Sequence, residues 1–285
     1  MNRSQRAALA LALGATTAVT VVLGSGAATA VQWVTHVGDI KSGSTVCSDE
    51  YFAQIKSDVD LFQDPFVYTP GDNEWTDCHR TNNGAYNPLE RLDKVRAVFF
   101  PKPGVTLGQR PARVESQQEQ GLPENVIWDR AGIQFSALHV VGSNNSLVPW
   151  TGATAANPQQ VSEVLARTSG AIEQIHETFG EARDEKRRAV VLLLQADMFD
   201  PTFPATFNDV YGFQPIINGD SHLFVQDRPL AVGSSYLLLY GVSTPVPNLT
   251  RITTTGSTTA TDYLRVTVTD DPVNVLSVTR VSYVS

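Results

Sequence analysis

One long amphipathic segment followed directly by an apolar run most constrains the fold of this chain. The segment "NPQQVSEVLARTSGAIEQIHETFGEARDEKRR" (157–188) has Pro158 near its start and a basic cluster at its end, which predicts a long helix. Its apolar positions keep helical spacing, at Val161, Val164, Leu165, Ile172, Ile175 and Phe179. The next residues, "AVVLLLQAD" (189–197), are almost continuously apolar, as in a strand covered on both faces. A helix leading into a buried strand predicts a layered α/β domain.

Shorter elements before this pair follow the same alternation. We predict strands over 32–40, 64–69 and 132–141 and helices over 48–62 and 87–100. Ser48 and Asn87 are suitable N-caps for the two helices, and Pro88 suits a first helical position. After residue 217, the segments "SSYLLLYGV", "DYLRVTVTD" and "VLSVTRVSYV" predict a strand-rich end, with 250–262 as a polar loop or hairpin tip.

The first 30 residues have the composition of a secretory signal peptide. A basic start, "MNRSQR", precedes an apolar stretch, and "SGAATA" then offers a small-residue cleavage site. We expect cleavage near Ala30 and export of one domain over 31–285 to the periplasm or the outside, with no membrane attachment. An uncleaved membrane anchor is the alternative, although the apolar run is only marginally long enough to span a bilayer.

The chain contains two cysteines, Cys47 and Cys78. An exported compartment favours a disulfide between them, and two free thiols are the alternative.

The net charge of −8 restricts the possible partners. Phosphate backbones bind to basic surfaces, so we do not expect this chain to bind a nucleic-acid scaffold. A small phosphate-bearing substrate stays compatible with the acidic charge, because a bound metal ion can supply the local positive charge.

Polar residues gather where the predicted strands end. Four apolar runs finish in carboxylate, amide or imidazole residues, in "VTHVGDIKSG", "VYTPGDNEW", "LLLQADMFD" and "IINGDSHLF". A fifth, "LHVVGSNNS", ends in Ser143, Asn144 and Asn145. Sites in α/β sheets gather at the carboxyl ends of strands. Hard oxygen ligands with a few imidazoles suit divalent cations. One Gly-Asp pair is a turn signal, whereas three after apolar runs indicate a metal site.

The order of "GDIKSG", "GDNEW" and "GDSH" resembles that of the calcineurin-like metallophosphoesterases. That family has Asp-x-His, Gly-Asp-x-x-Asp, Gly-Asn-His-Asp/Glu and Gly-His-x-His motifs and an isolated histidine after a later strand. The strings "VYTPGDNEWTDCHR", "NPLERL" and "HVVGSNNS" are closest to a bacterial exported branch, and the likeness spans about residues 32–268. The resemblance implies a four-layer α/β/β/α sandwich that lacks its first strand.

The resemblance also implies site residues. Asp39 corresponds to the aspartate that bridges two metals, Asn73 to an amide ligand, and Gln195 or Asp197 to the isolated histidine; we take Asp197. Two further positions, Asp220 and His222, match the histidines of the last motif. Glu74 occupies the place of the catalytic histidine, so Glu74 or His79 is expected to protonate the leaving group. Arg80, with His79, is expected to face the phosphate.

The implied activity is hydrolysis of phosphate monoesters or diesters by a metal-bound hydroxide. The implied cofactors are one or two divalent ions, Mn, Fe, Zn or Mg. Two departures stand against this activity: the first family motif is absent, and Ser42 replaces the second aspartate of Gly-Asp-x-x-Asp. A catalytically inactive relative that acts as a binding protein is therefore the alternative.

Overall fold

The computed structural model describes residues 18–19, 33–199, 217–256 and 262–282. Their strands form three sheets. The largest has the order β4-β5-β6-β7-β8-β10-β9, a smaller one has the order β1-β2-β3, and β11 and β12 form a hairpin. Strands β2 and β3 pair in parallel, as do β6 with β7, β7 with β8 and β8 with β10. The mixed α/β class predicted from the sequence is confirmed.

The bounds of the elements place each strand and helix. The strands are β1 (Ala18–Val19), β2 (Val34–His36), β3 (Phe66–Tyr68), β4 (Glu115–Gln117), β5 (Leu122–Arg130), β6 (Ile133–Ala137), β7 (Ala189–Leu193), β8 (Ile217–Asn218), β9 (Val225–Asp227), β10 (Arg251–Thr253), β11 (Asp262–Val268) and β12 (Leu276–Ser282). The α-helices are α2 (Asp49–Val59), α3 (Pro88–Phe99), α4 (Gly142–Asn145), α5 (Pro158–Asp184) and α7 (Ser235–Leu239). Short 3-10 turns cover Thr76–His79, Thr81–Asn83 and Gln118–Gln120.

Apolar side chains from the two larger sheets and the hairpin form the central core. Val67 of the small sheet, Phe135 of the large sheet and Val266 of the hairpin belong to one buried cluster. Trp33 and Trp128 stack across it with ring centroids 5.6 Å apart. The small sheet and the hairpin therefore pack against one face of the large sheet.

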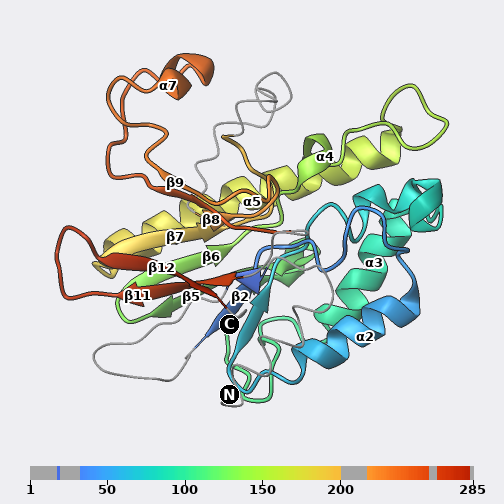
Figure 1. Ribbon diagram of the computed structural model, residues 1–285, viewed down its shortest axis with the longest axis horizontal. Coiled ribbons are helices and arrows are strands. Elements are labelled where there is room, and N and C mark those ends of the chain that lie inside the picture. The colour runs from blue at the N-terminus through green and yellow to red at the C-terminus, as the bar shows by residue number, and fades with distance from the viewer. Residues whose placement is uncertain (1–17, 20–32, 200–216, 257–261, 283–285) are drawn as a thin grey trace.

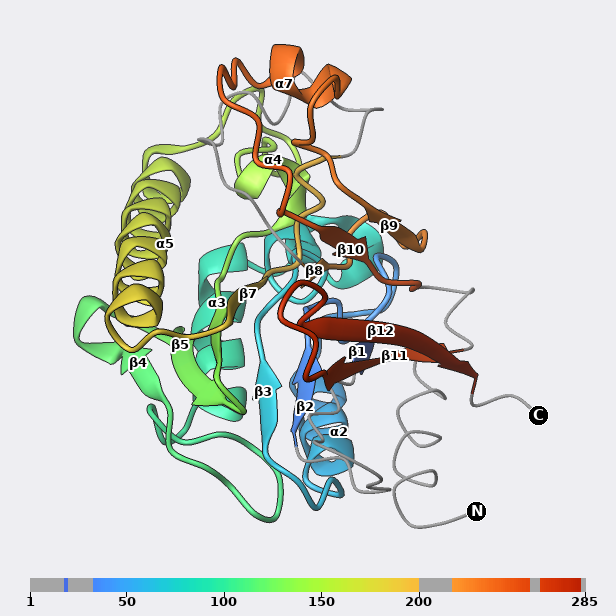
Figure 2. The same cartoon turned by 90° about the vertical axis from the view of Figure 1, so that its left-hand side faces the viewer.

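Helices cover the outer faces. Ala171 of α5 packs with Leu192 beside the large sheet, and Phe52 of α2 and Val95 of α3 pack with Phe66 beneath the small sheet. Figure 1 shows α5 along the upper side and α2 and α3 at the lower right, with strands between them. Figure 2 shows α5 on the left and the β11–β12 hairpin on the right. Both faces of the strand that was predicted to be fully buried, β7, are covered.

Helix starts follow the predicted caps. Ser48 accepts from the backbone N–H of Tyr51, and Asn87 accepts from Leu89 and Glu90. Asn157 and Gln160 form a reciprocal capping box at the start of α5.

Replacing Asn157 by alanine is expected to lower the free energy of unfolding by about 1 kcal/mol, because the N–H of Gln160 loses its acceptor. Urea unfolding measures the change. Gln159→Ala, at an exposed neighbouring position, is the control and should leave stability unchanged. Equal losses in both variants would contradict the capping role.

The predicted disulfide is confirmed. Cys47 and Cys78 are bonded across 31 residues of chain, with their Cα atoms 5.8 Å apart. The bond links the segment after β2 to the 3-10 turn after β3.

Of three further sequence predictions, two need correction and one falls mostly outside the described residues. Residues 235–239 form the short helix α7, not a strand, because Ser234 caps its start and Tyr236 and Tyr240 pack on the same face against Phe199. Residues 251–253, within the stretch 250–262 that was predicted as a loop or hairpin tip, form β10, which pairs with β8 and β9; strands β4 and β5 were not predicted. Of the predicted signal peptide, only 18–19 are described, and they pair antiparallel with β2; the cleavage position lies outside the described residues.

Candidate metal centre

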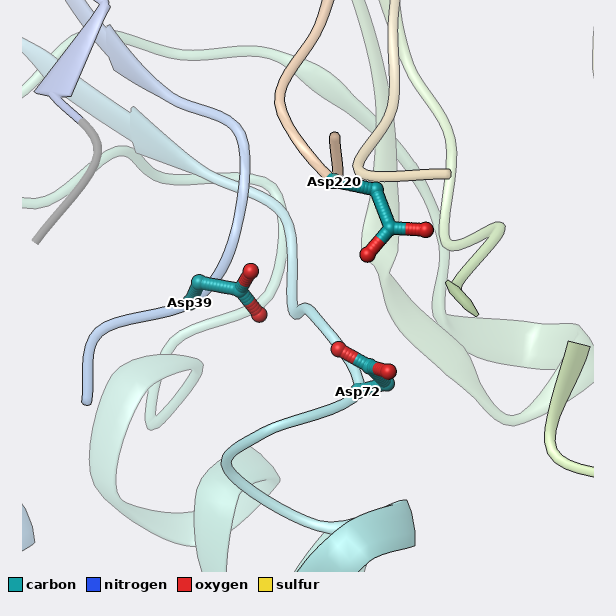
Figure 3. Close-up of side chains that lie close together, drawn as sticks. All are labelled: Asp39, Asp72 and Asp220. Carbon is teal, nitrogen blue, oxygen red and sulfur yellow. The ribbon is translucent and has the colours of Figure 1, made fainter. Parts of the chain in front are cut away.

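Three aspartates converge at the carboxyl ends of strands from the small sheet and the large sheet. Asp39 follows β2, Asp72 follows β3 and Asp220 follows β8. One carboxylate oxygen of each lies within 4.8 Å of the other two. Figure 3 shows the three carboxyl groups turned toward a common space. Parallel pairing places the carboxyl ends of β2 and β3 at one edge, so residues far apart in sequence meet there. The group can hold a metal ion.

Glycines let the loops approach one another closely. A Cβ atom at Gly71 would lie 2.4 Å from Asp39 Oδ1. A Cβ atom at Gly142 would lie 2.7 Å from Asp220 Oδ2 and 2.9 Å from Asp72 Oδ2. Only glycine fits where a carboxylate meets the backbone this closely. The glycines after the apolar runs therefore bring the three carboxylates together.

Gln195, after β7, contacts all three aspartates. Its Nε2 atom donates to Asp220 Oδ1 at 2.8 Å, and it lies 3.1 Å from Asp72 Oδ1 and 3.2 Å from Asp39 Oδ2. An amide nitrogen carries two hydrogens, so it cannot satisfy three carboxylates fully. Among the described residues, none forms a hydrogen bond with the buried Asp39 Oδ1. Within the described residues, hydrogen-bond donors do not satisfy all the carboxylate oxygens of the three aspartates. A bound cation would supply the missing positive charge to these oxygens.

The electrostatics of the site also favour a bound cation. Burial raises the pKa of Asp39 and of Asp220 well above the usual range, and the nearby Asp72 carboxylate raises both further. Neighbouring buried carboxylates cannot all ionise without compensating charge. The group will bind either protons or a cation.

A second layer of polar residues orients Asp72. Ser143 Oγ bonds to Asp72 Oδ2 at 2.8 Å and to Asp77 Oδ1 at 2.9 Å. Arg80 Nη1 lies 2.7 Å from Asp77 Oδ2, and the Arg80 side chain is 41% exposed. Burial raises the pKa of Asp77 to about 7, with a further contribution from Asp72. The chain Arg80–Asp77–Ser143 thus links a half-exposed guanidinium to the aspartate group.

Ser143 lies in a left-handed backbone turn. Residues Ser143, Asn144, Asn145 and Ser146 all have positive φ, at 50°, 54°, 49° and 74°. Each such residue raises the energy by about 1 kcal/mol for an L-amino acid. Arg167 Nη2 donates to the carbonyl of Asn145 at 3.0 Å and its Nη1 to the carbonyl of His139 at 3.1 Å. These bonds from α5 hold the turn against that strain.

His222 lies at the edge of the aspartate group. Its Nε2 atom is 4.0 Å from Asp39 Oδ2, and its side chain is 33% exposed. Burial lowers its pKa, which favours the neutral imidazole that ligates metals. The sequence prediction placed Asp39, Asp220 and His222 in one site, and the structure brings these three together.

Asp197 does not belong to the group of three aspartates. Its carboxylate accepts from Ser221 Oγ at 2.6 Å, Asn218 Nδ2 at 3.2 Å and Arg251 Nη1 at 3.3 Å. These partners tie the loop after β8 to β10. Gln195 thus faces the three aspartates, whereas Asp197 supports the loop that carries Asp220. A ligand role for Asp197 stays a prediction.

Glu74 lies beneath the site. Its side chain is 0% exposed, and Oε1 accepts from Tyr68 Oη at 2.6 Å, the N–H of Gly71 at 2.6 Å and the N–H of Asp39 at 3.1 Å. Burial raises its pKa. Glu74 therefore holds the Gly71 turn in place. A proton-donor role for Glu74 stays a prediction.

Asn73 is 8% exposed, and its backbone carbonyl is bonded to a buried side chain. The fully buried Lys41 donates from Nζ to the carbonyl of Asn73 at 2.7 Å. The side-chain oxygen of Asn73 lies 3.1 Å from where a Cβ of Gly43 would be. A ligand role for Asn73 stays a prediction.

His79 and Arg80 lie on the exposed side of the disulfide-linked turn. His79 Nδ1 accepts from the N–H of Thr151 at 2.9 Å, which places any ring proton of the neutral form on Nε2. Burial lowers the pKa of His79, and Arg80 lowers it further. Their predicted contact with a phosphate stays a prediction.

Asp72 was not among the predicted site residues. A signal was present: aligned without gaps to Gly-Asn-His-Glu, the string Gly-Asp-Asn-Glu puts Asp72, not Asn73, on the family's asparagine ligand.

No protein-family model matches the chain, and no curated protein and no solved structure matches it either. The metallophosphoesterase resemblance therefore stays a prediction carried by the quoted strings. Within the described ranges, no helix is both long and apolar enough to cross a membrane.

Proposed function

We propose that this chain binds a divalent cation through Asp39, Asp72 and Asp220, with His222 as a further ligand. The convergence of the three buried carboxylates carries this proposal. Oxygen ligands with one imidazole suit Mn²⁺, Mg²⁺, Fe²⁺ or Zn²⁺, and one ion suffices for the ligands present.

We further propose that the cation serves hydrolysis of a phosphate monoester or diester. The family resemblance supports this activity, and so does the layering of α5, the large sheet, the small sheet and the helix pair α2 and α3. That layering is compatible with the four-layer α/β/β/α sandwich, and in the small sheet β2 lies between the antiparallel β1 and the parallel β3. A bound divalent ion would supply Lewis-acid polarisation of the phosphoryl group and a more acidic water.

The residues of the chain have separate tasks in this proposal. Asp39, Asp72 and Asp220 hold the cation, and Ser143 orients Asp72. Arg80, fixed by Asp77, presents a half-exposed guanidinium that suits phosphate oxygens. Glu74 maintains the Gly71 turn, and we assign it this structural role.

Hydrolysis of an aryl phosphate monoester and diester by the purified chain tests the activity. We expect turnover with Mn²⁺ and none with chelator. Asp39→Asn should also be inactive, and asparagine tolerates the positive φ of 59° at this position better than alanine. A folded protein that binds Mn²⁺ but hydrolyses neither ester would contradict the phosphoesterase proposal.

A catalytically inactive binding protein is the second candidate. The contact of Gln195 Nε2 with all three aspartates favours it, because an amide donor replaces a metal ligand there. Mn²⁺ binding without turnover would be the expected result for this candidate.

A further inference from the structure

We infer that Gln195 competes with the cation for the three aspartates and thereby lowers the affinity of the site for metal. This inference rests on the proposed function, since it concerns the same cation. It assigns to Gln195 a role in setting metal affinity.

The orientation of the Gln195 amide is determined by Gly142. The N–H of Gly142 donates to Gln195 Oε1 at 2.6 Å. Rotating the amide by half a turn would place its NH₂ group against this N–H, leaving two donors facing each other. The NH₂ group therefore faces the aspartates, and the oxygen that could ligate a cation faces away.

The position of Gln195 is restricted as well. Its Cγ atom lies between two loops, 2.9 Å from where a Cβ of Gly38 would be and 3.0 Å from that of Gly71. Its backbone carbonyl accepts from the N–H of Gly219 at 3.1 Å and of Asp220 at 2.9 Å. The side chain cannot move aside without losing contacts in the loops that carry the aspartates.

The cation and the amide compete for the same carboxylate oxygens. Nε2 lies 2.8 to 3.2 Å from an oxygen of each aspartate. A divalent ion needs oxygens at about 2.0 to 2.6 Å, so an ion bound by all three would meet the amide hydrogens. Binding requires Gln195 to leave, and the N–H of Gly142 then loses its partner. The site should therefore fill only at high cation concentration.

Mn²⁺ titration by calorimetry of the full chain with two Gln195 variants tests this role. Gln195→Met keeps the length but removes the competing donor, and we expect it to bind Mn²⁺ at least about tenfold more tightly than the wild type. Gln195→Glu keeps an acceptor for Gly142 and adds a carboxylate. We expect it to bind Mn²⁺ more tightly still and to melt at a lower temperature in chelator, because like charges then crowd the site.

A matched control is Gln174→Met. Gln174 is another buried amide, whose Nε2 donates to Ser136 Oγ at 2.8 Å and to the carbonyl of Ala137 at 2.9 Å. This variant should lose stability and leave Mn²⁺ affinity unchanged.

The outcomes separate the inference from the proposed function. Binding by the wild type with equal or weaker binding by Gln195→Met would overturn the inference alone. No Mn²⁺ binding by the wild type or by either Gln195 variant would overturn the proposed cation site and the inference with it.

Discussion

Replacing Asp72 by asparagine is expected to weaken Mn²⁺ binding by about a hundredfold or more. Asp72 offers one of the three carboxylates of the group and contacts both Ser143 and Gln195. Loss of an outer partner of a metal ligand already weakens affinity about 10- to 100-fold, so loss of a ligand charge should do at least as much. Calorimetric titration with Mn²⁺ measures the change.

The same variant should be more stable than the wild type in chelator. Asp72 raises the pKa of Asp39 and of Asp220 through charge repulsion, and asparagine removes that repulsion. A gain in stability with a loss of binding is the expected signature of a functional carboxylate cluster. Thermal melting with and without Mn²⁺ shows both effects.

Asp197→Asn is the matched control, with the same chemical change one loop away. It weakens the bonds to Ser221 and Arg251, so we expect a less stable protein. Its Mn²⁺ affinity should fall far less than that of Asp72→Asn, because Asp197 supports the loop of Asp220 but is not one of the three ligands. The reverse pattern, normal binding by Asp72→Asn and lost binding by Asp197→Asn, would restore Asp197 as the ligand and remove Asp72.

Replacing Glu124 by glutamine should lower the free energy of unfolding by about 3 kcal/mol. The Glu124 side chain is 0% exposed, and Arg96 donates to it from Nη2 at 2.6 Å and from Nε at 3.0 Å. His139 Nδ1 lies 2.8 Å from the same carboxylate. Glutamine removes the charge opposite Arg96 and leaves a half-buried guanidinium poorly compensated.

The interactions of Glu124 should also make the stability of the fold sensitive to acid. Burial alone would raise its pKa, but the hydrogen bond from His139 and the ion pair with Arg96 outweigh burial and hold the pKa at about 2. Burial lowers the pKa of His139, so the neutral ring donates from Nδ1 and Arg96 supplies the charge. Because the folded pKa lies below the unfolded value of 4.5, the stabilisation is present above pH 4.5 and is lost as pH falls toward 2.

Urea unfolding at pH 7, 4.5 and 2.5 checks this prediction. The wild type should lose stability between pH 4.5 and 2.5 by more than Glu124→Gln does. Glu119→Gln, at an exposed position, should follow the wild type. Parallel curves for wild type and Glu124→Gln would rule out Glu124 as the source of the acid sensitivity.

The sequence by itself was sufficient for the long helices α2, α3 and α5, since their signals are local. Ser48 and Asn87 cap the helices that follow them, as predicted, because a cap contacts only residues two or three positions away. The short helix α7 was predicted as a strand, because a five-residue apolar stretch has no period long enough to separate the two.

The sequence also indicated that polar groups at strand ends would meet, and Asp39, Asp220 and His222 do lie together. It could not decide whether Gln195 or Asp197 faces the site. Both lie an even number of residues after Leu193, the end of β7, so strand alternation points them to the same side. Only the tertiary structure made that choice. The loop after β6 and the loop after β8 bond to the backbone of Gln195, which turns its amide to the aspartates and leaves Asp197 with Arg251. Contacts between segments distant in sequence decided the site, and no local pattern contains them.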